Sequence, residues 1–255
     1  MTKPNKAERK RRIVAELRAN PTVRISTLAE AFSVSAETVR RDIDELSAGG
    51  LVNRTYGGAA ATSMSHEPAV DQRFDAMVTE RRRIARLAAT MVEPGDVVMV
   101  DAGSTVTHFA QQLAVEGTEC TVITNSLGVA TALGTAEPVR VILAPGHYVG
   151  REHAVYGPET ADFIKGFHAN RAIIGASGLT VEGATEAHSA AAWVKRAMLA
   201  RAERCSLLVD HGKFAQRFLE VVCPLDGLDD LVSDAKPPKA LGAALKRAGV
   251  ALRLG

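Results

Sequence analysis

The stretch that decides the fold is VVMVDAGST, residues 97–105. Its four leading apolar residues form a short run that is typical of a strand buried on both faces. The run ends at Asp101, and a glycine and two hydroxyl residues then lead into a helical segment that extends to Val115. A buried strand, a polar turn and a helix together make one unit of an α/β sheet.

The same pattern recurs towards the C-terminus. Further strands are predicted from short runs rich in β-branched residues, at 121–124, 139–143, 172–174, 206–209 and 228–232. Helical segments lie among them, notably at 105–115, 159–167 and 187–202. This alternation predicts a Rossmann-like α/β domain with a mostly parallel sheet over residues 93–255.

Residues 1–60 have a different pattern, that of closely spaced helices. A helix is predicted over 5–19, and Asn20-Pro21 ends it. Ser26 is expected to cap a short helix through Ala31, and Ser35 to cap a third helix that runs to about Ser47. Two short helices joined by a tight turn predict a helix-turn-helix, and residues 51–58 predict the strand pair of a wing.

The third helix presents polar side chains on the face opposite its apolar stripe. In a helix-turn-helix this face enters the major groove of DNA, where arginine pairs with guanine or grips a phosphate. The expected DNA-contacting residues are Ser35, Thr38, Arg40 and Arg41, with Arg54 on the wing. The alternative interpretation is a three-helix packing unit with a solvated charged face.

A connecting region is predicted between the two domains, over residues 61–92. Its first part, around residues 60–68, is poor in apolar residues and is expected to be a linker. Residues 71–91 predict one connecting helix, and the triplet Arg81–Arg83 on it is expected to be a solvated face or a contact between copies.

Composition and charge limit the class of protein. The 255 residues are 46% hydrophobic and 24% charged, which suffices for a buried core, and no apolar run approaches the roughly 20 residues of a membrane span. Residues 1–60 carry 11 Lys and Arg against 7 Asp and Glu, a net charge of +4, whereas the rest carries −2. A basic head favours a polyanionic partner. The three cysteines, Cys120, Cys205 and Cys223, are expected to be reduced core residues of a cytoplasmic protein.

Polar and glycine residues gather where the predicted strands end. Because the carboxyl ends of parallel strands meet at one edge of the sheet, these residues are expected to form one ligand site. Hydroxyls, backbone amides and lysines at one edge suit a small anionic, polyhydroxylated ligand. The candidates are Asp101, Gly103, Ser104, Thr105, Thr124, Asn125, Ser126, Gly175, Ser177, Gly178, Asp210 and Lys213, with Lys195 on the preceding helix. Each also has an ordinary interpretation as a cap or a turn residue.

Several other kinds of site find no support. The glycine-rich loops of dinucleotide and Walker-type nucleotide sites do not occur, so no cofactor is expected. The histidines show no metal-ligand spacing and do not group with the cysteines, so no metal site is expected either.

Two blocks of residues resemble the DeoR family of bacterial transcriptional regulators. The head resembles its helix-turn-helix in residues 34–46, then Gly50-Leu51, Arg54 and 57–59. The body resembles the family's sensor domain, related to sugar-phosphate isomerases, in residues 101–105, 124–126, 157–158, 174–178, 194–198 and 210–214.

The resemblance implies a repressor of a carbohydrate operon. Its implied partners are double-stranded operator DNA and a phosphorylated sugar or polyol that releases it, and the implied assembly is a homodimer or homotetramer. The phosphate would lie on Gly103, Ser104 and Thr105, with Asp101, Asn125, Lys195, Asp210 and Lys213 around the sugar.

Four departures from the family pattern accompany this resemblance. Tyr56 stands where the wing has histidine, and the other three are expected around the pocket, at Pro145-Gly146, Ala190–Trp193 and Gly212.

The alternative is a sugar-phosphate isomerase, with Asp and Lys at the strand ends as base and electrophile. Two observations count against an enzyme, so no catalytic residue is expected. The alanines at 190–192 remove an expected carboxylate, and an enzyme would leave the basic head unexplained.

Overall fold

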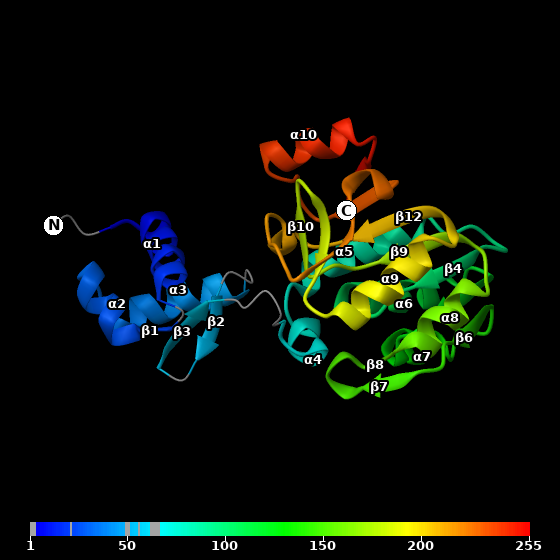
Figure 1. Ribbon diagram of the computed structural model, residues 1–255, viewed down its shortest axis with the longest axis horizontal. Coiled ribbons are helices and arrows are strands. Elements are labelled where there is room, and N and C mark those ends of the chain that lie inside the picture. Colours follow the sequence, from blue (N-terminus) through cyan, green and yellow to red (C-terminus); the bar gives the residue numbers. More distant parts are fainter. Residues whose placement is uncertain (1–3, 21, 49–51, 56, 62–66) are drawn as a thin grey trace. The chain divides into compact units, whose positions relative to one another are not determined.

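The computed structural model describes residues 4–20, 22–48, 52–55, 57–61 and 67–255, with only the backbone of 18, 19, 22, 48, 53–55 and 59–61. The chain divides into two compact units, residues 1–66 and 67–255. Figure 1 shows their elements along the chain. The matching pair Gly50-Leu51, the departure at Tyr56 and most of the predicted linker lie outside the described residues.

The first unit, the head, combines three helices with a small sheet. Asn5 caps the first helix by accepting a hydrogen bond from the amide of Glu8. The strands pair antiparallel in the order β1-β3-β2, and the β2–β3 pair confirms the predicted wing strands. The elements are α1 (Lys6–Ala19), β1 (Thr22–Arg24), α2 (Ile25–Phe32), α3 (Ala36–Ala48), β2 (Val52–Thr55) and β3 (Gly58–Ala61).

The start of α2 differs from the prediction. Ser26 is not its N-cap: the helix begins at Ile25, and Arg24 occupies the capping position without a side-chain hydrogen bond. The reason is β1, which pairs with β3 and holds the chain extended up to Arg24, so that the helix follows the strand directly. Gly58 permits this pairing because a Cβ there would lie 2.3 Å from the carbonyl oxygen of Val23.

The apolar stripes of the three helices meet in one core. Seven apolar residues of these helices are buried together, namely Ile13, Leu17, Leu28, Phe32, Val39, Ile43 and Leu46. The predicted cap of α3 is also confirmed, since Ser35 Oγ accepts a hydrogen bond from the Thr38 amide at 3.2 Å. The packing therefore fixes which face of α3 is left exposed.

The second unit, the sensor unit, is built on a seven-stranded sheet. All its strand pairs are parallel, in the order β15-β14-β12-β9-β4-β5-β6. The strands are β4 (Val97–Val100), β5 (Cys120–Thr124), β6 (Val139–Leu143), β9 (Ala169–Ile174), β12 (Ala202–Leu208), β14 (Asp230–Ser233) and β15 (Ala251–Leu254). The prediction of an α/β domain with a mostly parallel sheet is confirmed.

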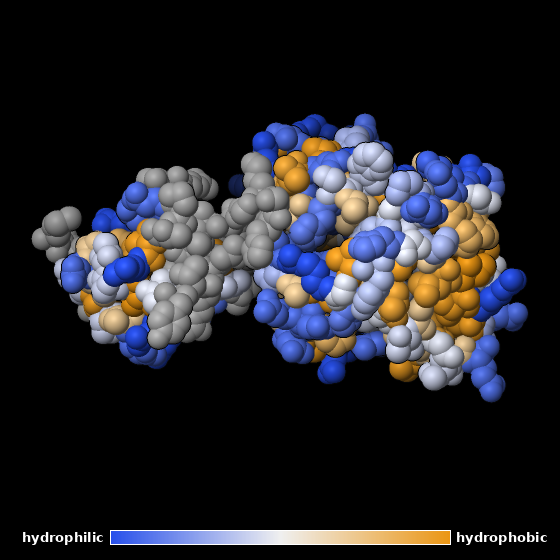
Figure 2. Space-filling model, turned by 60° about the horizontal axis from the view of Figure 1, so that its bottom comes forward, coloured by the Kyte–Doolittle hydropathy of each residue, from blue (hydrophilic) through white to orange (hydrophobic). Residues whose placement is uncertain are grey.

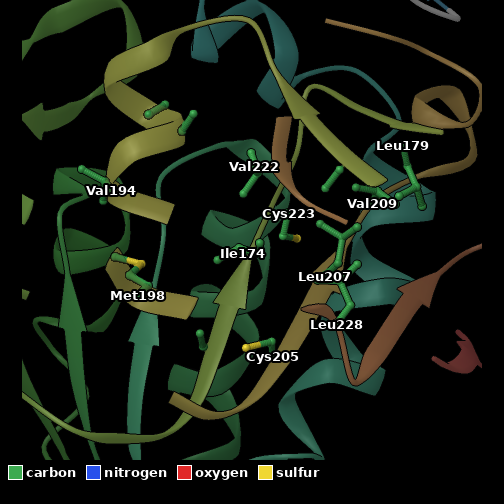
Figure 3. Packing of buried hydrophobic residues seen from close by; sticks show 14 of the residues in the cluster. Ile174, Leu179, Val194, Met198, Cys205, Leu207, Val209, Val222, Cys223 and Leu228 are labelled. Atoms are coloured by element: carbon green, nitrogen blue, oxygen red, sulfur yellow. The ribbon is translucent and has the colours of Figure 1, made fainter. Parts of the chain in front are cut away.

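Helices cover both faces of this sheet (Figure 1). Side chains alternate between the two faces of β4: Met99 packs with α8, α9 and α10, whereas Val98 and Val100 pack with α5, α6 and α7. Figure 3 shows part of the first layer, with Val194 and Met198 beside the strand residue Ile174. The helices are α4 (Val70–Phe74), α5 (Val78–Ala89), α6 (Ser104–Glu116), α7 (Leu127–Leu133), α8 (Pro158–Lys165), α9 (Ser189–Leu199) and α10 (Lys239–Arg247).

Smaller elements connect the layers. β7 and β8 form a hairpin, and β10, β11 and β13 form an antiparallel sheet. These strands are β7 (His147–Val149), β8 (Ala154–Tyr156), β10 (Gly178–Thr180), β11 (Gly183–Glu186) and β13 (Glu220–Cys223), and short 3-10 helices span Gly150–Glu152, His211–Lys213 and Leu225–Gly227. On the face of the sensor unit in view in Figure 2, hydrophobic areas lie among hydrophilic side chains.

The single connecting helix predicted over 71–91 is wrong. The chain forms α4 and α5 instead, and Met77 between them has a left-handed φ of 54°. Tertiary contacts cause the break, because the Arg81 guanidinium donates a hydrogen bond to the carbonyl of Arg73 at the end of α4 and also pairs with Asp210. Arg81 is buried, so the prediction of a solvated Arg81–Arg83 face is wrong for this residue.

The three cysteines are free and buried, as predicted. Within the described ranges, no helix is long and apolar enough to cross a membrane.

Candidate functional site

The sheet order reverses between β4 and β9. From β4 the chain builds outward through β5 to β6, and from β9 it builds in the opposite direction through β12, β14 and β15. The crevice outside the carboxyl ends of two such neighbouring strands is where open α/β sheets bind ligands. The turns after β4 and β9, which contain Asp101 and Gly175, border this crevice, and the Gly175 amide donates to Asp101 Oδ2 at 3.3 Å.

The turn after β4 exposes the N-terminus of α6. Gly103 has a φ of +136°, which side-chain-bearing residues rarely adopt, and it holds the capping position with no side-chain hydrogen bond. The first amides of a helix have no partner within the helix and attract anions. Ser104 and Thr105, both buried, add hydroxyl groups at this point.

A cavity of about 30 Å³ lies at this helix end. Six of the predicted residues line it, namely Gly103, Ser104, Thr105, Gly175, Lys195 and Lys213. The remaining lining residues are Glu67, Arg73, Ala102, Val106, Ala176 and Glu186. Residues from separate stretches of the sensor unit thus converge as the parallel topology predicts.

Lys195 is fully buried and holds two carboxylates together. Its ammonium pairs with Asp101 and lies 3.2 Å from Glu186 Oε2. Burial by itself would lower the pKa of Lys195, but these two carboxylates outweigh that effect and raise its pKa, so the ammonium stays charged. Glu186 therefore supplies a carboxylate where the alanines at 190–192 suggested one was missing.

Glu67 also lines the cavity. Its Oε1 lies 2.5 Å from Lys213 Nζ, and its Oε2 accepts a hydrogen bond from the Ser177 hydroxyl at 2.7 Å and lies 3.6 Å from Arg73. Burial by itself would raise the pKa of Glu67, but Lys213 and Arg73 outweigh it and hold the pKa well below its usual value. Glu67 is therefore an ionised carboxylate within the site.

Seven of the predicted residues do not line the cavity. Two of these, Asp101 and Ser177, contact lining residues, Asp101 through Lys195 and Ser177 through Glu67. Thr124 accepts a hydrogen bond from the Ser126 amide, Asn125 donates to the Val155 carbonyl, and Ser126 caps α7. A Cβ on Gly178 would lie 2.2 Å from the Gln216 carbonyl, so this glycine serves close packing. Asp210 pairs with Arg81 at 3.0 Å instead of facing the cavity.

The family departures expected around the pocket do not line the cavity that the described residues form. Gly146 packs against Thr160, to which a Cβ would come within 2.1 Å, and Trp193 points outward with 60% of its surface exposed. Gly212 donates its amide to Asp210.

Three charged residues of the site were missed from the sequence: Glu67, Arg73 and Glu186. Glu67 and Arg73 fall in the predicted linker and connecting helix, and Glu186 ends a strand of a small sheet that was not predicted. Nothing in local periodicity marks them. The signal that was available is the Glu67-Pro68 pair, where the apolar-poor stretch ends.

The predicted DNA-contacting residues share one exposed surface of α3. Ser35, Arg40 and Arg41 are exposed and Thr38 is half-buried, whereas the neighbouring Asp42 is buried and pairs with Arg9 at 2.6 Å. Arg40 pairs with Glu37 at 3.2 Å. Arg54 lies in β2, opposite Ala59, but its side chain is outside the described atoms.

A helix-turn-helix head with a wing, followed by an α/β unit with a ligand crevice, defines the class of DNA-binding regulators that respond to a small molecule. Comparisons with known proteins agree. Residues 9–65 match the DeoR-like helix-turn-helix domain, and residues 76–235 match the DeoR C terminal sensor domain.

The chain is 32% identical to the HTH-type transcriptional repressor GlcR of Bacillus subtilis, over 91% of this chain and 88% of that protein. It is 33% identical to the glycerol-3-phosphate regulon repressor of Escherichia coli, over 89% and 90% respectively. The crystal structure of eIF2B beta from Chaetomium thermophilum aligns with 94% of this chain and with 70% of the eIF2B beta chain. The sequence identity is 16% and the TM-score is 0.49, so this similarity supports no inference about function.

The chain belongs to the DeoR family of bacterial transcriptional regulators. It is a DNA-binding regulator, and its curated relatives are regulators, not enzymes. The isomerase alternative is therefore set aside.

Proposed function

We propose that this protein represses a carbohydrate-utilisation operon and is released from its operator by a phosphorylated sugar or polyol. The observation that carries the proposal is the cavity at the N-terminus of α6, where Lys195 and Lys213 accompany the hydroxyls of Ser104 and Thr105. Free helix amides and lysines suit a phosphate, and hydroxyls and carboxylates suit the hydroxyl groups of a sugar. The name of the Escherichia coli relative, which refers to a phosphorylated polyol, supports this ligand class.

Within the site, we assign the phosphate to Gly103, Ser104 and Thr105, with Lys213 as its counter-ion. Asp101 orients Lys195, and Lys195 and Glu186 face the remainder of the cavity. Thr124, Asn125, Ser126, Gly178 and Asp210 are proposed to shape the site from behind, because each already makes a hydrogen bond or ion pair within the fold. Among the described residues, Asn125 Oδ1 is buried without a partner.

In the head, we propose that Ser35, Thr38, Arg40 and Arg41 contact the major groove and that Arg54 contacts the backbone from the wing. A single small head binds DNA weakly, so two heads on half-sites about one helical turn apart would raise the affinity. The proposed assembly is therefore a homodimer or homotetramer in the cytoplasm, where the DNA is.

The test is a thermal-shift panel of purified wild-type protein against sugars and polyols, each paired with its phosphorylated form. A ligand at 100 times its dissociation constant stabilises the folded state by about 2.7 kcal/mol. We expect phosphorylated members to raise the melting temperature and their free partners not to. A panel in which free sugars stabilise as much as their phosphates would contradict the assigned phosphate site.

A further inference from the structure

Glu67 is the first residue of the sensor unit. The preceding residue, His66, ends the unit that contains the DNA-binding helices. A residue at such a junction is ordinarily exposed, yet Glu67 is only 4% exposed and its carboxylate lines the cavity. The side chain of the first residue of the sensor unit is therefore held inside the candidate ligand site.

The backbone at this point is fastened as well. Arg151 donates a hydrogen bond to the carbonyl of Glu67 at 2.6 Å, and Arg73 donates from Nε to the carbonyl of Pro68 at 2.9 Å. Arg73 in turn pairs with Glu152. Loss of the Glu67 carboxylate from the cavity would remove the side-chain part of this attachment and weaken the hold on the two carbonyls.

The cavity is too small for a sugar phosphate while Glu67 is inside it. Its volume is about 30 Å³. Sites that enclose small organic ligands measure roughly 300–1,000 Å³. Some part of the lining must therefore move before a phosphorylated sugar enters.

Charge identifies the part that moves. Four cations, Arg73, Arg151, Lys195 and Lys213, face four buried carboxylates, Glu67, Asp101, Glu152 and Glu186. A phosphate added to this set would be an uncompensated buried anion, which is costly. Asp101 and Glu186 share Lys195, whereas Glu67 alone holds Lys213 among the residues that the structure describes. Its departure frees a lysine at the site of the incoming anion.

We propose that the carboxylate of Glu67 is an internal ligand of the sensor site, which an anionic effector displaces. The phosphate takes over Lys213, the carboxylate leaves the cavity, and the chain at Glu67 loses its side-chain attachment. This inference rests on the proposed function, because it requires an anion to bind at the same cavity. In this inference, effector binding is coupled to DNA binding by one exchange, in which the phosphate replaces the Glu67 carboxylate as the partner of Lys213.

The test compares inorganic phosphate binding by full-length wild type and Glu67→Gln, measured by calorimetric titration at constant ionic strength. Glutamine keeps the size of the side chain and removes its charge, so we expect at least tenfold tighter phosphate binding by the variant. The matched control is Glu182→Gln, which removes a carboxylate that is exposed and paired with Arg217 outside the cavity. The control should bind phosphate as wild type does.

Equal or weaker phosphate binding by Glu67→Gln would overturn the inference, as would a gain of the same size in Glu182→Gln. The proposed function is judged separately, on whether wild type distinguishes sugar phosphates from free sugars in the thermal-shift panel. A wild type that passes the panel while Glu67→Gln binds phosphate no better would leave the function standing and remove the internal ligand.

A second measurement uses wild type alone and does not depend on the folding of a variant. Hydrogen–deuterium exchange is followed over residues 67–75, where the amides of Arg73 and Asp75 bond within α4. On saturation with the phosphorylated compound that stabilises the protein most, we expect these amides to exchange faster while those of α6 exchange more slowly. Slower or unchanged exchange over 67–75 would contradict displacement.

Discussion

Two adjacent arginines on α3 are placed differently. Arg40 lies near Glu37 of its own helix, and the 3.2 Å pair holds its guanidinium close to the helix surface. Arg41 is also exposed, and the described part of the chain gives it no ion-pair partner. Its guanidinium is thus available to a base edge or a phosphate. Substitution of Arg41 therefore tests the DNA contact more directly than substitution of Arg40.

We expect Arg41→Ala to weaken operator binding while leaving effector binding unchanged. Loss of an arginine contact to DNA costs about 1–3 kcal/mol, which corresponds to roughly 5- to 150-fold in affinity. Fluorescence anisotropy with an operator duplex measures the loss, and Arg247→Ala, an exposed arginine on α10, is the matched control. Operator affinity at the wild-type level would remove α3 from the role of recognition helix.

The buried Glu67 carboxylate also predicts a dependence of stability on pH. Its pKa is lowered in the folded protein, so its contribution is present above the unfolded-state pKa of about 4.3 and is lost as the pH falls towards the folded-state value. We therefore expect the stability difference between wild type and Glu67→Gln to shrink as the pH falls below about 4.

Thermal unfolding between neutral pH and about pH 3 measures this difference, and groups that do not interact with Glu67 cancel in it. Trp193, the only tryptophan, lies in α9 and reports on the sensor unit. A difference that stays constant over this range would show that Glu67 is not held ionised by its partners.

At the scale of elements, hydrophobic periodicity correctly predicted the helices and strands whose buried side chains recur at regular spacing. The strands β4, β5 and β6 and the helix α6 lie where apolar runs and a helical stripe indicated. The small sheet of β10, β11 and β13 was not predicted, because its strands are too short to stand out and β13 comes from a distant segment of the chain. Glu186, at the end of β11, was missed for the same reason.

The break between α4 and α5 shows another limit of local pattern. Neither glycine nor proline marks it, and the stripe of Ile84 and Ala88 continues the helical pattern. The break depends on distant partners: Phe74 stacks on His108, and Arg81 reaches Asp210. The convergence of strand-end residues was predictable because parallel topology alone places them together. The sequence did not predict which of these residues face the cavity, because Asp210 and Asn125 bond to partners elsewhere in the fold.

At the scale of the whole molecule, the chain divides into two compact units, and we propose that Glu67, the first residue of the second unit, couples them. A tenfold change in operator affinity needs only about 1.4 kcal/mol of difference in effector affinity between the two states. Exchange of one charged contact, such as that between Glu67 and Lys213, is large enough to supply this free-energy difference.

The most direct test of the account is operator binding with and without effector. A duplex selected by the protein from a random pool is titrated at fixed salt, because salt alone changes protein–DNA affinity. The added compound is the sugar phosphate that stabilises the protein most, with its free sugar as control. We predict that the sugar phosphate weakens operator binding at least tenfold and that the free sugar has no effect. Unchanged or tighter binding at saturating sugar phosphate would contradict it.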